Sequence, residues 1–184
     1  MVVDKQELDA RAKRVKLVLM DVDGVLTDGK YFHVPNPAGG LFEVKLFDSQ
    51  DGIALQWLHR YGFQTGLISG RVAEATAERA KSSHMAYVYM GHTDKLPLFE
   101  EIVQKSGFDP QEIAYVGDDL TDCILFRRVG LAVATANAKP EVKAMAHYIT
   151  EVPGGSGAIR DITEVLLKAQ GLWEKVLAHY EVEY

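Results

Sequence analysis

The sequence contains a single cysteine, Cys123, so no disulfide bond can form within the chain. It has no stretch of about eighteen apolar residues, the length that a bilayer-spanning helix needs, and its first residues lack the apolar core of a signal peptide. A chain that cannot form an internal disulfide bond fits a reducing compartment. We therefore expect a cytoplasmic protein that does not contact a membrane.

Positive charge is also scarce. The chain has 20 Lys and Arg residues against 26 Asp and Glu residues, which gives a formal net charge of -6. Nucleic acids are bound by clustered Lys and Arg side chains, so we expect no nucleic-acid partner. The 184 residues, 47% of them hydrophobic, include no repeat and no flexible linker, and we expect one domain over residues 1–184.

Short apolar runs alternate with helical patterns along the chain. The runs lie at residues 15–20, 63–69, 86–90, 113–117 and 131–134. The helical patterns lie at residues 50–61, 72–81 and 94–106, and a further helix is expected at 158–170. This alternation predicts an α/β fold, a Rossmann-like three-layer sandwich with a central parallel sheet.

One insertion interrupts this pattern. Two alternating segments within residues 30–48 flank a turn rich in Pro and Gly, which predicts a β-hairpin flap at about residues 29–48. No other gap has room for a cap domain. The tail, about residues 153–184, ends in an amphipathic stretch whose apolar side chains would suit a subunit contact.

Polar residues follow the predicted strands, and ligands of open parallel sheets bind beyond the carboxyl ends of the strands. The candidates at these positions are Asp21, Asp23, Ser69, Gly70, Arg71, Lys95, Asp118 and Asp119. Converging carboxylates repel one another unless a cation neutralises them. An all-oxygen set without a His or Cys cluster favours Mg²⁺ and disfavours zinc.

The spacing of Asp21 and Asp23 indicates a reaction type. Two carboxylates two residues apart on a loop can divide the work, one attacking phosphorus while the other transfers a proton. A metal ion and a lysine beside the nucleophile would neutralise the phosphoryl oxygens. We therefore expect a phosphatase.

Four motifs, in chain order, resemble those of the haloacid dehalogenase superfamily. They are Asp21-Val22-Asp23-Gly24-Val25-Leu26-Thr27-Asp28, Ser69-Gly70-Arg71, Lys95 and Gly117-Asp118-Asp119-Leu120-Thr121-Asp122. The resemblance implies that Asp21 is the nucleophile and Asp23 the acid and base. It also implies phosphate contacts from Ser69 and Lys95. Mg²⁺ would be held by Asp21, the Asp23 carbonyl and Asp118, with Asp119 beside it.

The chain resembles the 3-deoxy-D-manno-octulosonate 8-phosphate phosphatase family over nearly its whole length. The resemblance lies in the missing cap and in residues 47–52 and 154–161. This resemblance implies a homotetramer in which hairpins and neighbouring subunits complete each site. The implied substrate is an eight-carbon acidic sugar phosphate of lipopolysaccharide synthesis. Gly70, Arg71, Phe47 and Asp51 are the expected substrate contacts.

Several alternatives stay open. The family usually has basic residues where this chain has Gln50 and Ser156, so a nine-carbon 2-keto sugar 9-phosphate of the sialic type is a second candidate substrate. A non-catalytic regulatory subunit whose acidic pocket only binds metal is a third reading. Locally, Ser69 could cap a helix and Lys95 could be an exposed helix residue. Asp119 and Asp122 could serve a helix start.

Overall fold

The computed structural model describes residues 2–182 of the chain. Its centre is a six-stranded, entirely parallel sheet in the order β5-β4-β1-β6-β7-β8. The strands are β1 (Leu17–Met20), β4 (Gln64–Ser69), β5 (Tyr87–Met90), β6 (Ile113–Gly117), β7 (Leu131–Ala134) and β8 (Tyr148–Ile149). The sequence predicted all of these strands except β8.

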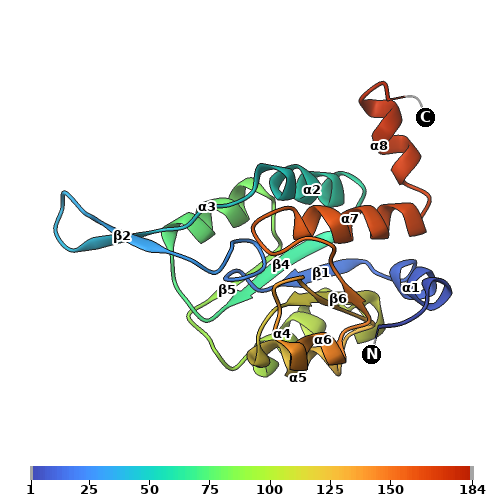
Figure 1. The fold of residues 1–184 in the computed structure, drawn as a ribbon, viewed down its shortest axis with the longest axis horizontal. Coiled ribbons are helices and arrows are strands. Elements are labelled where there is room, and N and C mark those ends of the chain that lie inside the picture. The colour runs from blue at the N-terminus through green and yellow to red at the C-terminus, as the bar shows by residue number, and fades with distance from the viewer. Residues whose placement is uncertain (1, 183–184) are drawn as a thin grey trace.

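Helices cover both faces of the sheet (Figure 1). One face carries α1 (Lys5–Ala12), α2 (Ser49–Arg60), α3 (Glu74–Ser82) and α7 (Ala158–Ala169); the other carries α4 (Leu96–Ser106), α5 (Cys123–Phe126) and α6 (Pro140–Met145). The short 3₁₀ helices are η1 (Pro110–Glu112) and η2 (Leu120–Asp122). The predicted three-layer sandwich is confirmed.

The alternation of side chains along β1 divides the core into two parts. Val18 and Met20 face the cluster that contains Leu55 of α2 and Ile162 of α7. Leu17 and Leu19 face the opposite cluster, which α4, α5 and α6 complete. All four residues of β1 are fully buried. A strand that is buried on both faces has a continuous apolar sequence, and β1 has such a sequence here.

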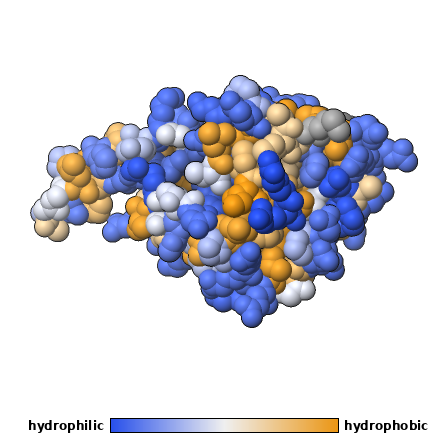
Figure 2. Space-filling model, turned by 90° about the horizontal axis from the view of Figure 1, so that it is seen from below, coloured by the Kyte–Doolittle hydropathy of each residue, from blue (hydrophilic) through white to orange (hydrophobic). Residues whose placement is uncertain are grey.

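The predicted flap is a two-stranded antiparallel hairpin of β2 (Phe32–Pro35) and β3 (Leu41–Val44). The Asn36 side chain accepts a hydrogen bond from the Ala38 amide (2.9 Å) and organises the turn. The hairpin projects from the body of the molecule (Figure 1) and carries apolar side chains toward its outer end (Figure 2). Phe32 and Leu41, for example, are exposed.

After α7 the chain turns into α8 (Trp173–His179), which stands off from the layers (Figure 1). Trp57 of α2 contacts Trp173 edge to face and donates a hydrogen bond to the Tyr180 hydroxyl (3.0 Å). None of the helices between residues 2 and 182 has the length and apolar character needed to cross a membrane. The single domain over residues 1–184 stays a prediction, and residues 1, 183 and 184 lie outside the described part.

Candidate active site

The strand order creates a crevice at the carboxyl ends of β1 and β6. From β1 the chain builds outward through β4 and β5, then returns to the other side of β1 to form β6 and β7. Ligands bind at such a switch point because the loops diverge there. Asp21 directly follows β1 and Asp118 directly follows β6.

A cavity of about 210 Å³ opens at this point. Its lining residues are Asp21, Asp23, Gly70, Arg71, Thr93, Lys95, Asp118, Asp119 and Thr121. Most of the residues selected from the sequence therefore converge in space. Thr93, on the loop before α4, was not selected, because nothing in its local pattern marks it.

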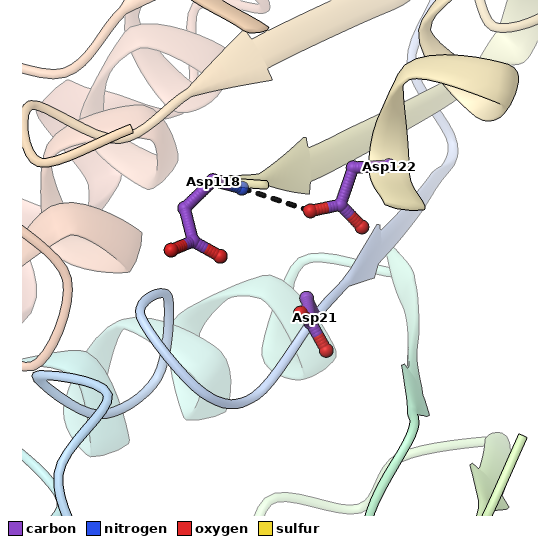
Figure 3. Close-up of side chains that lie close together, drawn as sticks. All are labelled: Asp21, Asp118 and Asp122. Carbon is purple, nitrogen blue, oxygen red and sulfur yellow. Dashed lines mark hydrogen bonds between the residues drawn. The ribbon is translucent and has the colours of Figure 1, made fainter. Parts of the chain in front are cut away.

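Three carboxylates meet beside the cavity (Figure 3). Oxygens of Asp21, Asp118 and Asp122 lie within 4.8 Å of one another. Burial raises the pKa of Asp21 to about 6; Lys95 opposes this shift and Asp122 adds to it. Burial, followed by the charges of Asp122 and Asp21, raises the pKa of Asp118 to about 7. Lys95 therefore does not offset the combined effect of burial and of the neighbouring carboxylates on Asp21 and Asp118.

Asp122 differs from the other two acids because its oxygens are already occupied. Its Oδ1 accepts hydrogen bonds from Lys95 Nζ (2.7 Å) and the Tyr115 hydroxyl (2.8 Å). Its Oδ2 accepts hydrogen bonds from the backbone amides of Asp118 (2.9 Å) and Asp119 (3.1 Å). Asp122 thus fixes the lysine and the loop after β6, which leaves Asp21 and Asp118 as the more available ligands.

The residues fit a hard divalent cation. Asp118 Oδ1 is buried without a hydrogen-bond partner among the described residues, which is costly unless another group satisfies it. The donors are all oxygens, as Mg²⁺ prefers. Gly24 leaves the space for this arrangement, since a Cβ there would lie 2.1 Å from Asp118 Oδ2.

Lys95 is buried, which excludes the alternative of an exposed helix residue. It lies at the start of α4, with Nζ 3.2 Å from Asp21 Oδ1 and 3.1 Å from the Tyr115 hydroxyl. Burial alone would lower the pKa of this ammonium group, but Asp122 and Asp21 together raise the pKa above its ordinary value. Lys95 therefore stays positively charged beside Asp21.

The hairpin contributes two charged residues that sequence reasoning missed. Lys45 Nζ lies 2.6 and 2.8 Å from the two carboxylate oxygens of Asp23 and 3.5 Å from Glu43 Oε1. Glu43 also pairs with Arg71, whose guanidinium lies 3.9 Å from the centre of the Tyr31 ring. The available signal was the spacing of Glu43 and Lys45, which places both on one face of an otherwise apolar segment.

Two predicted residues are engaged in turns. Asp119 is exposed, caps η2 by accepting a hydrogen bond from the Leu120 amide (2.8 Å), and lies outside the three-carboxylate cluster. Ser69 is buried, and its Oγ accepts a hydrogen bond from the Arg71 amide (3.2 Å). The predicted metal contact of Asp119 and the predicted phosphate contact of Ser69 stay predictions.

Asp51 and Phe47 do not line the cavity. Asp51 is 2% exposed and accepts a hydrogen bond from the Arg160 amide (2.8 Å) at the start of α7. Burial raises its pKa to about 6. Phe47 packs on the core, with the Arg79 guanidinium 5.0 Å from its ring centre. The geometry does not support a substrate contact by Asp51, because its carboxyl group is enclosed between two helices.

Gln50 and Ser156, the two departures from the family pattern, lie in one place. Both line a second cavity of about 350 Å³ together with Gly157 and Arg160. The loop that carries Ser156 packs on the loop after β1, where a Cβ on Gly154 would lie 2.0 Å from the Gly24 carbonyl oxygen. The two positions are therefore neighbours, although about a hundred residues separate them in the chain.

Known proteins resemble this chain over most of its length. A family model described as haloacid dehalogenase-like hydrolase matches residues 65–159. The 3-deoxy-D-manno-octulosonate 8-phosphate phosphatase KdsC of Escherichia coli (strain K12) is 36% identical over 162 residues, which cover 88% of this chain and 84% of the relative.

Two crystal structures agree with this match. The 3-deoxy-D-manno-octulosonate 8-phosphate phosphatase from Moraxella catarrhalis, in complex with magnesium ion, phosphate ion and KDO, has a TM-score of 0.90 at 35% identity and covers 96% of this chain and 99% of its own. The enzyme of that name from Yersinia pestis has a TM-score of 0.86 at 34% identity, with coverages of 91% and 89%. Since these relatives are matched over most of their length, the resemblance inferred from the motifs is confirmed: the chain belongs to the haloacid dehalogenase-like hydrolases and, within them, to the 3-deoxy-D-manno-octulosonate 8-phosphate phosphatase family.

Proposed function

We propose that the protein is a magnesium-dependent phosphatase that hydrolyses 3-deoxy-D-manno-octulosonate 8-phosphate to the free sugar and phosphate. The observation that carries the proposal is the buried Lys95 lying between Asp21 and Asp122 at the switch point of the sheet. The names of the matched relatives support the substrate.

In the proposed mechanism Asp21 attacks the phosphorus atom and forms an aspartyl-phosphate. The departing sugar alkoxide takes its proton from Asp23, and Asp23 then accepts a proton from the water that cleaves the acyl phosphate. Lys95 stabilises the phosphoryl oxygens while charge develops on them. Ser69, Gly70 and Arg71 would contact the phosphate or the sugar at the cavity wall.

Asp21, the Asp23 carbonyl and Asp118 would hold Mg²⁺, with Asp119 at its periphery. When bound, the ion neutralises the excess negative charge of the carboxylates and of the phosphate. Asp122 keeps the Asp118 amide and Lys95 in place through its four hydrogen bonds.

We also propose a homotetramer in which neighbouring subunits close the site. The projecting hairpin of one subunit exposes apolar side chains, among them Tyr31, Phe32 and Leu46, and such a surface suits burial in an interface. Closure would exclude water from the cavity and strengthen its electrostatics. Sedimentation equilibrium should give four times the chain mass of 20.4 kDa; a monomer at assay concentrations would contradict the proposal.

A cytoplasmic location is part of the same proposal. A phosphate monoester carries charge that keeps it from crossing a bilayer unaided, so its phosphatase must work in the compartment that produces it.

A nine-carbon 2-keto sugar 9-phosphate is the second candidate substrate. It stays open because Gln50 and Ser156, which line the second cavity, stand where the family usually has two basic residues. Phosphate release from the two sugar phosphates, measured side by side, distinguishes the candidates. A preference for the nine-carbon ester would keep the mechanism and replace the substrate.

The decisive experiment is phosphate release with and without Mg²⁺ in the wild type and in Asp21→Asn. We expect activity that requires the metal and is lost in the variant, because an amide cannot form the acyl phosphate. Full activity in Asp21→Asn would refute the mechanism. Inactivity of the wild type on every phosphate ester, despite metal binding, would favour a non-catalytic regulatory subunit.

A further inference from the structure

Lys45 is buried at the end of an exposed hairpin. Its side chain is 0% exposed, although the adjacent Leu46 is 72% exposed and Leu41, on the preceding strand β3, is 64% exposed. The ammonium group donates hydrogen bonds to Asp23 Oδ1 (2.6 Å) and Oδ2 (2.8 Å). A lysine is rarely buried unless a paired charge repays its lost hydration, so this contact specifies the position of the side chain.

The pair is asymmetric in a way that suits catalysis. The Asp23 side chain keeps 22% of its surface exposed and lines the active-site cavity, whereas Lys45 is fully enclosed behind it. The lysine thus lies on the protein side of the carboxyl group, and the cavity lies on the other. A carboxyl group needs only one oxygen to exchange a proton, so one of the two hydrogen bonds from Lys45 can be given up while the other is kept.

The same face of the hairpin also reaches Arg71. Glu43 lies two residues before Lys45, 3.5 Å from its ammonium nitrogen, and pairs with the Arg71 guanidinium. Asp23, Lys45, Glu43 and Arg71 therefore form a chain of alternating charge from the loop after β1 to the loop after β4. This chain connects the hairpin to the active site of its own subunit.

We propose that Lys45 is a positioning residue that orients the carboxyl group of Asp23 toward the leaving-group oxygen of the substrate. This inference rests on the proposed phosphatase function, and it gives the hairpin a role in the chemistry of its own subunit. The competing explanation is that Lys45 only fastens the hairpin to the body of the protein. The two explanations differ in which substrates should be affected when the lysine is removed.

The test compares two leaving groups. A sugar alkoxide must be protonated as it departs, whereas 2,4-dinitrophenolate departs without a proton, so kcat/KM for its phosphate ester does not depend on a general acid. In Lys45→Met, kcat/KM for the preferred sugar phosphate should fall by roughly 100-fold, the lower end of a general-acid contribution. For 2,4-dinitrophenyl phosphate, kcat/KM should fall by less than about fivefold, since nucleophile and metal site are intact.

Lys30→Met is the matched control. Lys30 also belongs to the hairpin segment and also pairs with an aspartate, Asp28, but the pair is exposed. Exposed pairs contribute little, so kcat/KM should stay within about twofold of the wild type on both esters. Lys45→Arg keeps a cation that can bind both carboxylate oxygens and should recover part of the loss on the sugar phosphate.

Thermal unfolding of each variant separates chemistry from folding, and Lys45→Gln takes the place of Lys45→Met if the latter does not fold. Equal losses on both esters, or no loss on either, would overturn the assignment of Lys45. Loss confined to the sugar phosphate would support it. Wild-type protein that releases no phosphate from either ester with Mg²⁺ would overturn the proposed function and the assignment together.

Discussion

Replacing Asp122 by Asn should destabilise the metal-free protein, and more at pH 5 than at pH 8. The amide has nearly the same shape as the carboxylate but only one acceptor atom. Two of the four hydrogen bonds that Asp122 accepts, from Lys95, Tyr115 and two backbone amides, are therefore lost in either orientation of the amide. Lys95 also loses its nearest negative charge.

The magnitude follows from two opposing effects. Removing one partner of a buried ion pair costs about 3–5 kcal/mol. Against this, the substitution relieves the repulsion between Asp122 and the carboxyl groups of Asp21 and Asp118, but only where those groups are ionised. Their pKa values of about 6 and about 7 mean that both are mostly protonated at pH 5. The full cost of about 3 kcal/mol or more should therefore appear at pH 5.

The sign of the pH dependence can be checked by proton linkage. Asp122 raises the pKa of both neighbours, so the folded variant binds fewer protons than the folded wild type between about pH 4 and pH 7. Fewer bound protons in the folded state make stability rise more with pH. The deficit of Asp122→Asn should therefore shrink as the pH is raised to 8.

Urea unfolding at fixed protein concentration, with a chelator present, measures the difference at each pH. Asp119→Asn is the control at pH 5. It makes the same substitution three residues away, at an exposed N-cap where Asn is as good a capping residue as Asp. Its unfolding free energy should be less than about 0.5 kcal/mol below that of the wild type. An Asp122→Asn variant as stable as the wild type at pH 5, or a deficit that grows with pH, would refute the reasoning.

Two further predictions concern the carboxyl groups of Asp21, Asp118 and Asp51, whose pKa values are raised. Saturating Mg²⁺ should raise the melting temperature more at pH 8 than at pH 5. The reason is that protons compete with the ion for Asp21 and Asp118 below their pKa values of about 6 and 7. Equal increases of the melting temperature in thermal scans at both pH values would contradict this. Asp51, with a pKa raised to about 6, contributes stability that is present below pH 4 and lost as the pH rises through 6. The unfolding free energy of Asp51→Asn, relative to that of the wild type, should therefore increase by about 2–3 kcal/mol between pH 4 and pH 8. If the unfolding free energies of the two proteins change equally with pH, the raised pKa of Asp51 is disproved.

The parts of the fold that the sequence predicted are those in which local pattern and burial agree. The run before Asp21 is apolar on both faces because β1 lies in the middle of a covered sheet. The acids after β1 and β6 were expected to meet because parallel strands deliver their carboxyl ends to one edge. Strand β8, which has two residues, is too short for any period to reveal it.

Contacts between distant segments could not be predicted in the same way. Lys45 reaches Asp23 only because the chain returns through the hairpin to the loop after β1, and this return depends on the turn and on the Glu43–Arg71 pair. The Asp51 carboxyl group meets α7 because two helices far apart in sequence pack side by side. The sequence pattern identifies such polar side chains as candidate site residues, but it does not predict whether they face a ligand or a neighbouring helix.

The distribution of charge across the site explains how four neighbouring acids can take different roles. Asp122 pairs with Lys95, and Asp23 pairs with Lys45, so each of these carboxylates has a buried cation within hydrogen-bond distance. Among residues 2–182 no cation forms an ion pair with Asp118, and Asp21 shares Lys95 with Asp122 at the longer distance of 3.2 Å. Because buried negative charge without a full counter-charge is costly, these two carboxylates gain most from a divalent ion. This difference in counter-charge supports the proposed roles of Asp118 as a metal ligand and of Asp21 as nucleophile and metal ligand.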